Sequence, residues 1–424
     1  MTDMTPHFSH LFQRQRLGIR PGLEGITRLL AHLGDPQQYF PVIHVAGTNG
    51  KGSVASLIAA ILQAAGLRTG LYTSPHLVHF SERFQINGAT PDNQSLNDLV
   101  TRIEAADREQ NATFFEFTTA MAFLHFARSR VDMAVMETGM GGRWDATTAC
   151  HPALCVITGI GMDHKEFLGD TLAAIASEKA GIIKPGIPVI AGSLAPEALD
   201  VITRQAENCK APLFVMGQNF CTEKTRDSRY IYTGKTIFKD LHPGLEGEHQ
   251  ADNMAIAIAA VETITSLMTT PVLLDETILH KALTARKWPA RLQTLATSPL
   301  ILLDGAHNPQ AAEALAAYLR QKTSEPRTLV FGVLEDKDAV SILHHLTPLF
   351  SKFILTRPQN SRSLHPSALA DIFQGKHSET LLDAPEALAR AISITPANGT
   401  ICIAGSLYLA GEILRGMNEG ILPF

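Results

Sequence analysis

The stretch "HVAGTNGKGS", residues 44–53, places glycines, a lysine and a serine between an apolar run and a helix-forming segment. Such a loop presents backbone N–H groups and the positive end of a helix dipole to an anion. Lys51 can reach the β- and γ-phosphates of a nucleotide, and Ser53 can bind magnesium. The consensus G-x-x-x-x-G-K-[ST] is not met, because Val45 and Gly52 occupy its first and last positions. Glycine turns without a ligand also occur, but we expect nucleotide contacts from Thr48, Asn49, Gly50, Lys51, Gly52 and Ser53.

Two further residues lie where parallel strands should end, and a serine could join them. Glu137 ends "MAVME", His164 follows "CVITGI", and Ser74 stands in "TSPH". Open α/β sheets gather ligands at the carboxyl ends of their strands, and this oxygen and nitrogen set suits a divalent cation. Plainer interpretations remain: Glu137 as a helix cap or ion-pair partner, and His164 as a hydrogen-bonded loop residue. By itself, Lys179 of "ASEKAGI" would be an ordinary solvated lysine.

The elements that must position these residues follow an alternation of short apolar runs and helix-like segments, typical of a parallel sheet covered by helices. A polar interval over 221–249 contains alternating β-formers and predicts a small antiparallel excursion, followed by a helix over 253–268. Strands of the first region are expected over 42–47, 133–139, 153–160, 188–192 and 213–217.

A second alternation runs from residue 300 to residue 414 and suffices for an independent α/β domain. The segment between the two regions, 284–294, contains Pro289 and breaks the periodicity, so we expect it to be the linker. We therefore divide the chain into domains 1–288 and 289–424.

The composition limits the function classes. Hydrophobic residues make up 45% and charged residues 18% of 424 residues, as in folded globular proteins. The net charge of −5 provides no basic field for nucleic acid or an anionic membrane, so we expect neither as a partner. Five scattered cysteines without a C-x-x-C pair indicate neither a disulfide framework nor a zinc site. With no apolar leader or spanning segment, we expect a cytoplasmic protein.

The loop "AGTNGKGS", in which Gly-Ser follows the lysine, resembles that of the folate branch of the Mur ligase superfamily, a group of ATP-dependent amide-forming enzymes. This resemblance implies an α/β protein with an N-terminal P-loop-type ATPase domain, built on a mainly parallel sheet, and a smaller Rossmann-like C-terminal domain that contributes to ATP and glutamate binding. The similarity covers nearly the whole chain, through "YTSPHLVHFSERFQING", "FFEFTTAMAFLHF", "METGMGGRWDATT", "ITGIGMDHKEFLGDTLAAIASEKAGIIKPG", "GEHQADN", "WPAR" and "LDGAHNP".

The resemblance also implies a metal site with two magnesium ions. Positions matching Ser74, Glu137 and His164 bind one ion near the γ-phosphate of ATP, while the loop serine, Ser53, serves the ATP-bound ion. The position matching Lys179 carries a carbamate formed with carbon dioxide. That reaction needs a neutral amine, which burial or a nearby cation would favour.

The nucleotide and amino acid contacts implied by the resemblance come from both domains. Asn253 matches an adenine contact, and Arg291 matches a phosphate contact from the second domain. Asp304 is expected toward the ribose or the incoming amino acid, and His307 near the glutamate site. Isolated residues of these types are more often surface ion-pair partners. The residues expected to take part in catalysis are Lys51, His164, Lys179, Asp304 and His307.

For a pterin substrate, the resemblance implies two short segments. Asp145 is expected to hydrogen-bond the ring, and two phenylalanines could stack on it, although such aromatic residues are more often part of a core. Three positions depart from the common pattern: Trp144 replaces leucine, Thr148 asparagine and Ala290 glycine. The expected substrate contacts, beside His307, are Thr113, Phe114, Phe115, Glu116, Trp144, Asp145 and Ala146.

The function implied is an ATP-dependent ligase, expected to be a monomer, that joins L-glutamate to dihydropteroate and then to reduced folates through an acyl phosphate. A synthase acting on folates alone is the nearest alternative. A cell-wall Mur ligase is disfavoured by Gly52 and by the 43 residues that precede the loop. A regulatory nucleotide-binding module without chemistry is disfavoured by the presence of Glu137, His164 and Lys179. We also expect the second domain to close over the first, because water must be excluded from an acyl phosphate.

Overall fold

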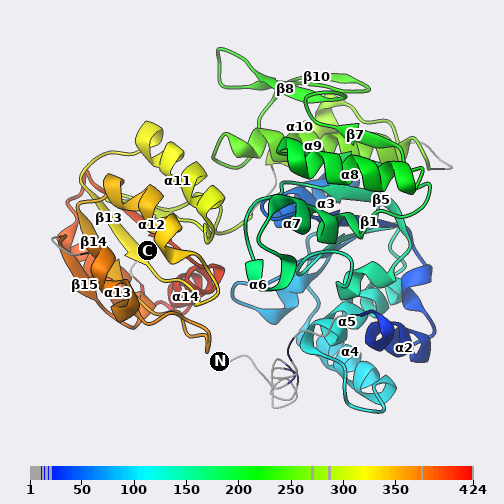
Figure 1. Ribbon diagram of the computed structural model, residues 1–424, viewed down its shortest axis with the longest axis horizontal. Coiled ribbons are helices and arrows are strands. Elements are labelled where there is room, and N and C mark those ends of the chain that lie inside the picture. The colour runs from blue at the N-terminus through cyan, green and yellow to red at the C-terminus, as the bar shows by residue number, and fades with distance from the viewer. Residues whose placement is uncertain are drawn as a thin grey trace.

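The computed structural model consists of two α/β units that lie side by side (Figure 1). It describes residues 22–268, 272–284, 288–373 and 376–422, together with residues 11, 14 and 18. Residues 1–10, which were expected to lack an apolar leader, lie outside the described part. The larger unit carries the phosphate loop, and the smaller one is built on a separate sheet.

The larger unit is organised around a seven-stranded sheet with the order β3-β2-β4-β1-β5-β6-β7. Its pairs are parallel except β2 with β3. The five strands predicted for this region are confirmed, whereas the two strands at one end were not foreseen. The bounds are β1 Val42–Ala46, β2 Thr69–Tyr72, β3 Phe84–Ile86, β4 Met133–Glu137, β5 Pro152–Ile157, β6 Val189–Ala191 and β7 Leu213–Val215.

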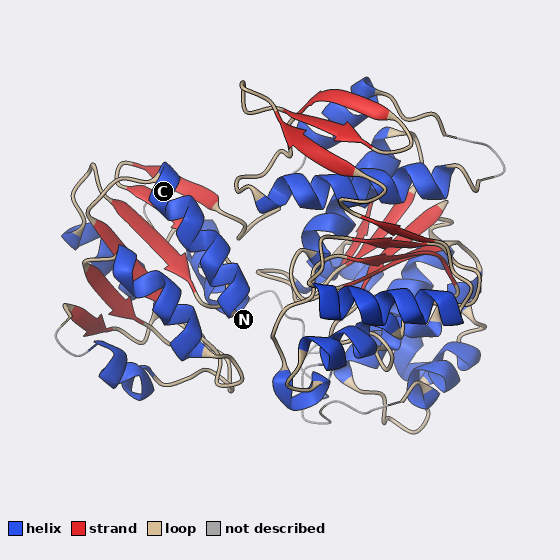
Figure 2. Cartoon of the chain, turned by 45° about the horizontal axis from the view of Figure 1, so that its top comes forward, coloured by secondary structure: helices blue, strands red, loops and turns tan. Residues whose placement is uncertain are grey.

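Helices cover both faces of this sheet (Figure 2). Along β1, Ile43 and Val45 pack with α3, α9 and α10, while Val42 packs with α2, α4 and α5. This alternation follows from the two-residue period of a strand. The bounds are α2 Glu24–His32, α3 Lys51–Ala64, α4 Asn93–Ala106, α5 Phe114–Arg128, α6 Lys165–Leu168, α7 Leu172–Ala180, α8 Pro196–Asn208, α9 His249–Thr265 and α10 Glu276–Thr284.

The predicted antiparallel excursion is confirmed as a three-stranded sheet of β8 Cys221–Lys224, β9 Tyr230–Thr233 and β10 Ile237–Leu241. Tyr232 and Phe238 pack into the same core as α9. The Tyr232 hydroxyl donates a 2.6 Å hydrogen bond to Glu262 of that helix. The small sheet is thereby fixed to the larger unit.

The smaller unit has a six-stranded sheet with the order β11-β12-β16-β13-β14-β15, parallel except for β11. Gln293 and Thr294 already pair with β12, so the predicted linker is too long at its C-terminal end. Residues 285–287 of that linker lie outside the described part. The strands are β11 Gln293–Thr297, β12 Leu300–Leu303, β13 Arg327–Phe331, β14 Lys352–Leu355, β15 Ser378–Thr380 and β16 Thr400–Ala404.

Two helix layers also enclose this second sheet. Helices α11 and α12 contribute to one apolar core, and α13 and α14 to another. Among the residues described, no helix is long and apolar enough to cross a membrane. The helices are α11 Pro309–Lys322, α12 Ala339–Leu346, α13 Ala384–Ile394 and α14 Leu407–Asn418.

Candidate active site

The phosphate loop connects the end of β1 to the start of α3 and requires its glycines. Gly47 and Gly50 have φ values of 155° and 84°. A Cβ atom on Gly47 would lie 2.0 Å from Thr158 Oγ1, and one on Gly50 would lie 2.6 Å from Asn253 Oδ1. Because no side chain of the described residues caps α3, its first turn can bind an anion. The loop thus has the conformation that a phosphate site would need, and its ligand stays a prediction.

Two lysines meet at the carbonyl of Gly47. Lys179 Nζ donates a 2.7 Å hydrogen bond to this oxygen, and Lys51 Nζ donates one of 3.2 Å. Lys179 is only 3% exposed. Burial, and then the neighbouring charge of Lys51, lower the pKa of Lys179 to about 7. A large fraction of this amine is therefore neutral at neutral pH, as carbamate formation requires.

A buried carboxylate lies beside the first turn of α3. Glu137 Oε2 accepts a 3.1 Å hydrogen bond from the backbone N–H of Ser74, and a Cβ on Gly52 would lie 3.5 Å from the same oxygen. Burial raises the pKa of Glu137, while the charge of Lys51 opposes that rise. A cation bound here would offset the cost of burying the carboxylate.

The oxygen donors at this point fit a magnesium ion better than a zinc ion. Magnesium prefers one or two carboxylates and completes its shell with phosphate oxygens and water. Glu137 and the buried Ser53 supply oxygen donors of that kind. In the described part of the chain, no group of three His, Cys, Asp or Glu residues could hold a metal by itself.

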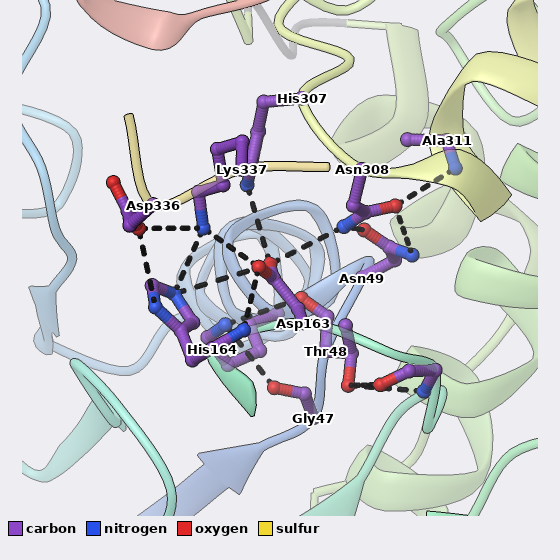
Figure 3. Close-up of polar contacts among 12 residues, drawn as sticks. Gly47, Thr48, Asn49, Asp163, His164, His307, Asn308, Ala311, Asp336 and Lys337 are labelled. Carbon is purple, nitrogen blue, oxygen red and sulfur yellow. Dashed lines mark hydrogen bonds and ion pairs between the residues drawn. The ribbon is translucent and has the colours of Figure 1, made fainter. Parts of the chain in front are cut away.

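His164 faces the smaller unit, which is called the second domain from here on (Figure 3). Its Nε2 lies 3.3 Å from Lys337 Nζ, and its Nδ1 lies 3.7 Å from Asp336 Oδ2. Burial lowers the pKa of His164 to about 4, although the adjacent carboxylate of Asp163 opposes this shift. Burial alone would raise the pKa of Asp163, but His307, His164 and Lys337 hold it below its usual range.

Arg291, Asp304 and His307 line the side of the cavity opposite the phosphate loop. Asp304 accepts 2.8 Å hydrogen bonds from the backbone N–H groups of Leu292 and Ala306, which fixes the start of this domain to the end of β12. Arg291 Nη1 donates to the carbonyl of Ala290 at 2.9 Å, and His307 Nδ1 lies 2.7 Å from the carbonyl oxygen of Gly305. These side chains are held at the surface that faces the phosphate loop.

One cavity of about 550 Å³ lies between the two domains and brings most of the predicted residues together. Its volume is within the usual range of ligand pockets. A second cavity of about 500 Å³ shares Gly52, Ser74, Glu137 and Arg291 with it. The first cavity is lined by Thr48, Asn49, Gly50, Lys51, Gly52, Ser53, Ser74, Glu137, His164, Lys179, Asn253, Arg291, Asp304 and His307, among others.

The residues predicted to contact a pterin line neither of these cavities. Thr113 and Glu116 form a capping box at the start of α5. Phe115 packs against Gly139, where a Cβ would lie 2.5 Å from the ring, and Phe114 stacks on the Arg83 guanidinium at 5.3 Å. Both rings are partly buried against the apolar core of α5. Any substrate role of this segment therefore rests on the two rings.

In the second segment predicted to contact a pterin, residues 144–146, the aspartate is also used in local hydrogen bonds. Asp145 Oδ2 accepts hydrogen bonds from Gly139 and Met140, and Oδ1 accepts two from Thr147. All four of its acceptor positions are therefore filled, and Asp145 holds its own loop. Ala146 is buried, and Trp144 is 51% exposed and available for a ligand.

Sequence reasoning missed Asp163, Asn308 and Lys337, which join the two domains at the edge of the cavity. Asp163 directly precedes His164, and Lys337 follows the end of β13 in "EDKD". Their positions after parallel strands could have drawn attention to them.

A phosphate loop facing a second α/β domain across one cavity defines a nucleotide-dependent enzyme of two domains. The model of the Mur ligase middle domain matches residues 45–261, and that of the Mur ligase, glutamate ligase domain matches residues 290–407. The chain therefore belongs to the Mur ligase family, in the branch of the folylpolyglutamate and dihydrofolate synthases. Its members are ATP-dependent ligases that form amide bonds.

Individual relatives match over nearly the full chain. The folylpolyglutamate synthase of Lacticaseibacillus casei is 37% identical and covers 93% of this chain and 94% of its own. The dihydrofolate synthase/folylpolyglutamate synthase of Bacillus subtilis is 35% identical, with coverages of 96% and 97%. The structure of Escherichia coli FolC in complex with DHPP and ADP superposes with a TM-score of 0.90 at 27% identity, covering 98% of this chain and 99% of that one.

Proposed function

We propose that this chain joins L-glutamate to dihydropteroate, giving dihydrofolate, and then adds glutamate to reduced folates on the same site. The observation that carries the proposal is the convergence of Lys51, Glu137 and Lys179 with Arg291 and His307 of the second domain on one cavity. The relatives named for both activities support it.

ATP would lie across the two domains. The backbone of the phosphate loop and Lys51 would hold the β- and γ-phosphates, and Asn253 would contact the adenine. From the second domain, Arg291 would reach a phosphate, and Asp304 the ribose or the incoming amino acid. The complexes of relatives with ADP and AMPPCP support this use of the cavity.

The chemistry follows from the charges. A substrate carboxylate attacks the γ-phosphorus of ATP, the bond to the β-phosphate oxygen breaks, and ADP and an acyl phosphate result. The amine of glutamate then attacks the acyl carbon, and the tetrahedral intermediate expels phosphate as an amide forms. Lys51 and Arg291 would neutralise the repelling anions, and His307 is our candidate to accept the amine proton.

Two magnesium ions would be held by Ser53, Ser74 and Glu137, whereas both ring nitrogens of His164, the fourth predicted ligand, face Lys337 and Asp336 of the second domain. Bound there, magnesium would neutralise phosphate charge. Lys179 would react with carbon dioxide as the neutral amine, losing a proton and becoming a carbamate. That change would turn a cation into an anionic oxygen ligand beside the same ions.

For the acceptor, we propose that Trp144 and the Phe114 and Phe115 rings contact the pterin. Asp145 and Ala146 would shape the loop beside it, and Thr113 and Glu116 would fix the start of α5.

The proposed partners are small molecules. A monomeric state, a cytoplasmic location and a domain boundary at residue 289 stay predictions.

The test is phosphate release measured with ATP, glutamate and one acceptor at a time. We expect glutamate-dependent release with dihydropteroate and with a tetrahydrofolate. Silence with dihydropteroate alone would favour a folate-only synthase, as the name of the Lacticaseibacillus casei relative would suggest. Silence with both acceptors, despite ATP binding, would contradict the proposed function and favour a module without chemistry.

A further inference from the structure

A buried ion pair joins the two domains at the edge of the cavity (Figure 3). Lys337 Nζ, from the loop between β13 and α12, lies 2.7 Å from Asp163 Oδ1, from the loop after β5. The two side chains are only 6% and 8% exposed. Each charge would be costly to bury alone, so each stabilises the buried position of the other. The pair can exist only when the domains are in contact.

The same pair contacts the two histidines of the site. Lys337 Nζ lies 3.3 Å from His164 Nε2, and Asp163 Oδ2 lies 3.6 Å from His307 Nε2. Asp336, the neighbour of Lys337, lies 3.7 Å from His164 Nδ1. Both ring nitrogens of His164 therefore face groups of the second domain. Separating the domains would remove these contacts together.

A second contact links the phosphate loop to the start of α11. Asn308 Nδ2 donates a 2.9 Å hydrogen bond to Asn49 Oδ1, and Asn49 Nδ2 donates one of 2.9 Å to Gln310 Oε1. Asn308 is 2% exposed and also caps α11 through the N–H of Ala311. It reaches Asp163 as well, at 3.4 Å. The two interdomain contacts are thus one connected network.

We propose that Lys337 and Asp163 are a positioning pair that holds the second domain closed over the phosphate loop and fixes the His164 ring during phosphoryl transfer. This inference rests on the proposed function. The pair acts through His164 and Asn49 rather than on the substrate. Its removal should lower turnover and open the molecule, while the nucleotide loop itself stays intact.

The test compares Lys337→Met with Lys224→Met. The control removes a lysine of an exposed ion pair, in which Nζ lies 3.3 Å from Glu248 Oε1 and the lysine side chain is 47% exposed. We expect Lys337→Met to lower kcat roughly tenfold or more at saturating substrates, because one partner of a buried pair is left alone. Small-angle scattering with ADP should show a larger radius of gyration for this variant. Lys224→Met should match the wild type in both.

A double-mutant cycle tests whether the two losses come from one shared interaction. Asp163→Asn should lower kcat similarly, and Asp163→Asn/Lys337→Met should be no worse than the more impaired single variant, because the lost interaction is shared. Lys337→Arg should keep most of the activity.

The proposal would be overturned if the fold-losses in kcat of the two single variants multiplied in the double variant. It would also be overturned if Lys337→Met kept the wild-type kcat and radius of gyration and only its KM for glutamate rose. The latter outcome would mean that Lys337 contacts the amino acid. An inactive wild-type enzyme would instead contradict the proposed function, and the scattering comparison would still test the pair.

Discussion

Replacing Lys179 by methionine should stabilise the protein while abolishing ligase activity. The Lys179 ammonium is buried, and its pKa falls from 10.5 to about 7 on folding. At 1.36 kcal/mol per pH unit, burying the charged form costs about 5 kcal/mol of stability. Methionine has a similar length and no charge. It loses the hydrogen bond to Gly47, worth about 1 kcal/mol, and some of the packing, so we expect a net gain of about 3 kcal/mol at pH 7.

The pH dependence identifies the cause of that gain. Between pH 7 and pH 10.5, the unfolded chain binds more protons at Lys179 than the folded protein does. The free energy of unfolding of the wild type should therefore rise with pH across this window, and the advantage of Lys179→Met should disappear near its upper end.

The measurement is thermal unfolding followed by tryptophan fluorescence, with EDTA and without nucleotide or carbon dioxide. A gain of 3 kcal/mol corresponds to a rise in Tm of about 5 °C at pH 7 for a unit of this size. Lys224→Met, which changes an exposed lysine, is the control. A variant that melts below the wild type at pH 7, or a gain that does not change with pH, would refute the reasoning.

Three further substitutions test other parts of the site. Asp145→Asn should lower the free energy of unfolding by about 1 to 3 kcal/mol, because its NH2 group must replace one of the two oxygens and cannot accept the two hydrogen bonds made there, and chemical denaturation checks this. Ala290→Gly should raise it by up to about 1 kcal/mol, because Ala290 has a φ of 56°, and a lower Tm would count against this strain. Gly411→Ala should lower kcat, because its Cβ would lie 2.2 Å from the Leu77 carbonyl of the other domain, and kinetics at saturating substrates measures that effect.

Local patterns in the sequence predicted the sheets and the phosphate loop well. Apolar runs mark β1, β4 and β5 because both faces of these strands are buried, and glycines mark the loop because its backbone has positive φ angles. The strands β2 and β11 were missed because they contain several polar or small residues. The predicted linker overlapped β11 for the same reason.

The site was predictable where residues follow a strand and less so where it depends on the placement of the domains. Asp163 and Lys337 are 174 positions apart, so no local pattern could pair them. Thr113 and Glu116 illustrate the opposite case. Their T-x-x-E spacing is that of a capping box, and this local signal accounts for both side chains without a ligand.

The central claim is that a carboxylate is phosphorylated in the cavity between Lys51 and the second domain. The most direct measurement is the transfer of an oxygen isotope from labelled dihydropteroate carboxylate to phosphate during turnover with ATP and glutamate. The account predicts one labelled oxygen in each phosphate released with amide formation. Unlabelled phosphate released together with the amide product would contradict it.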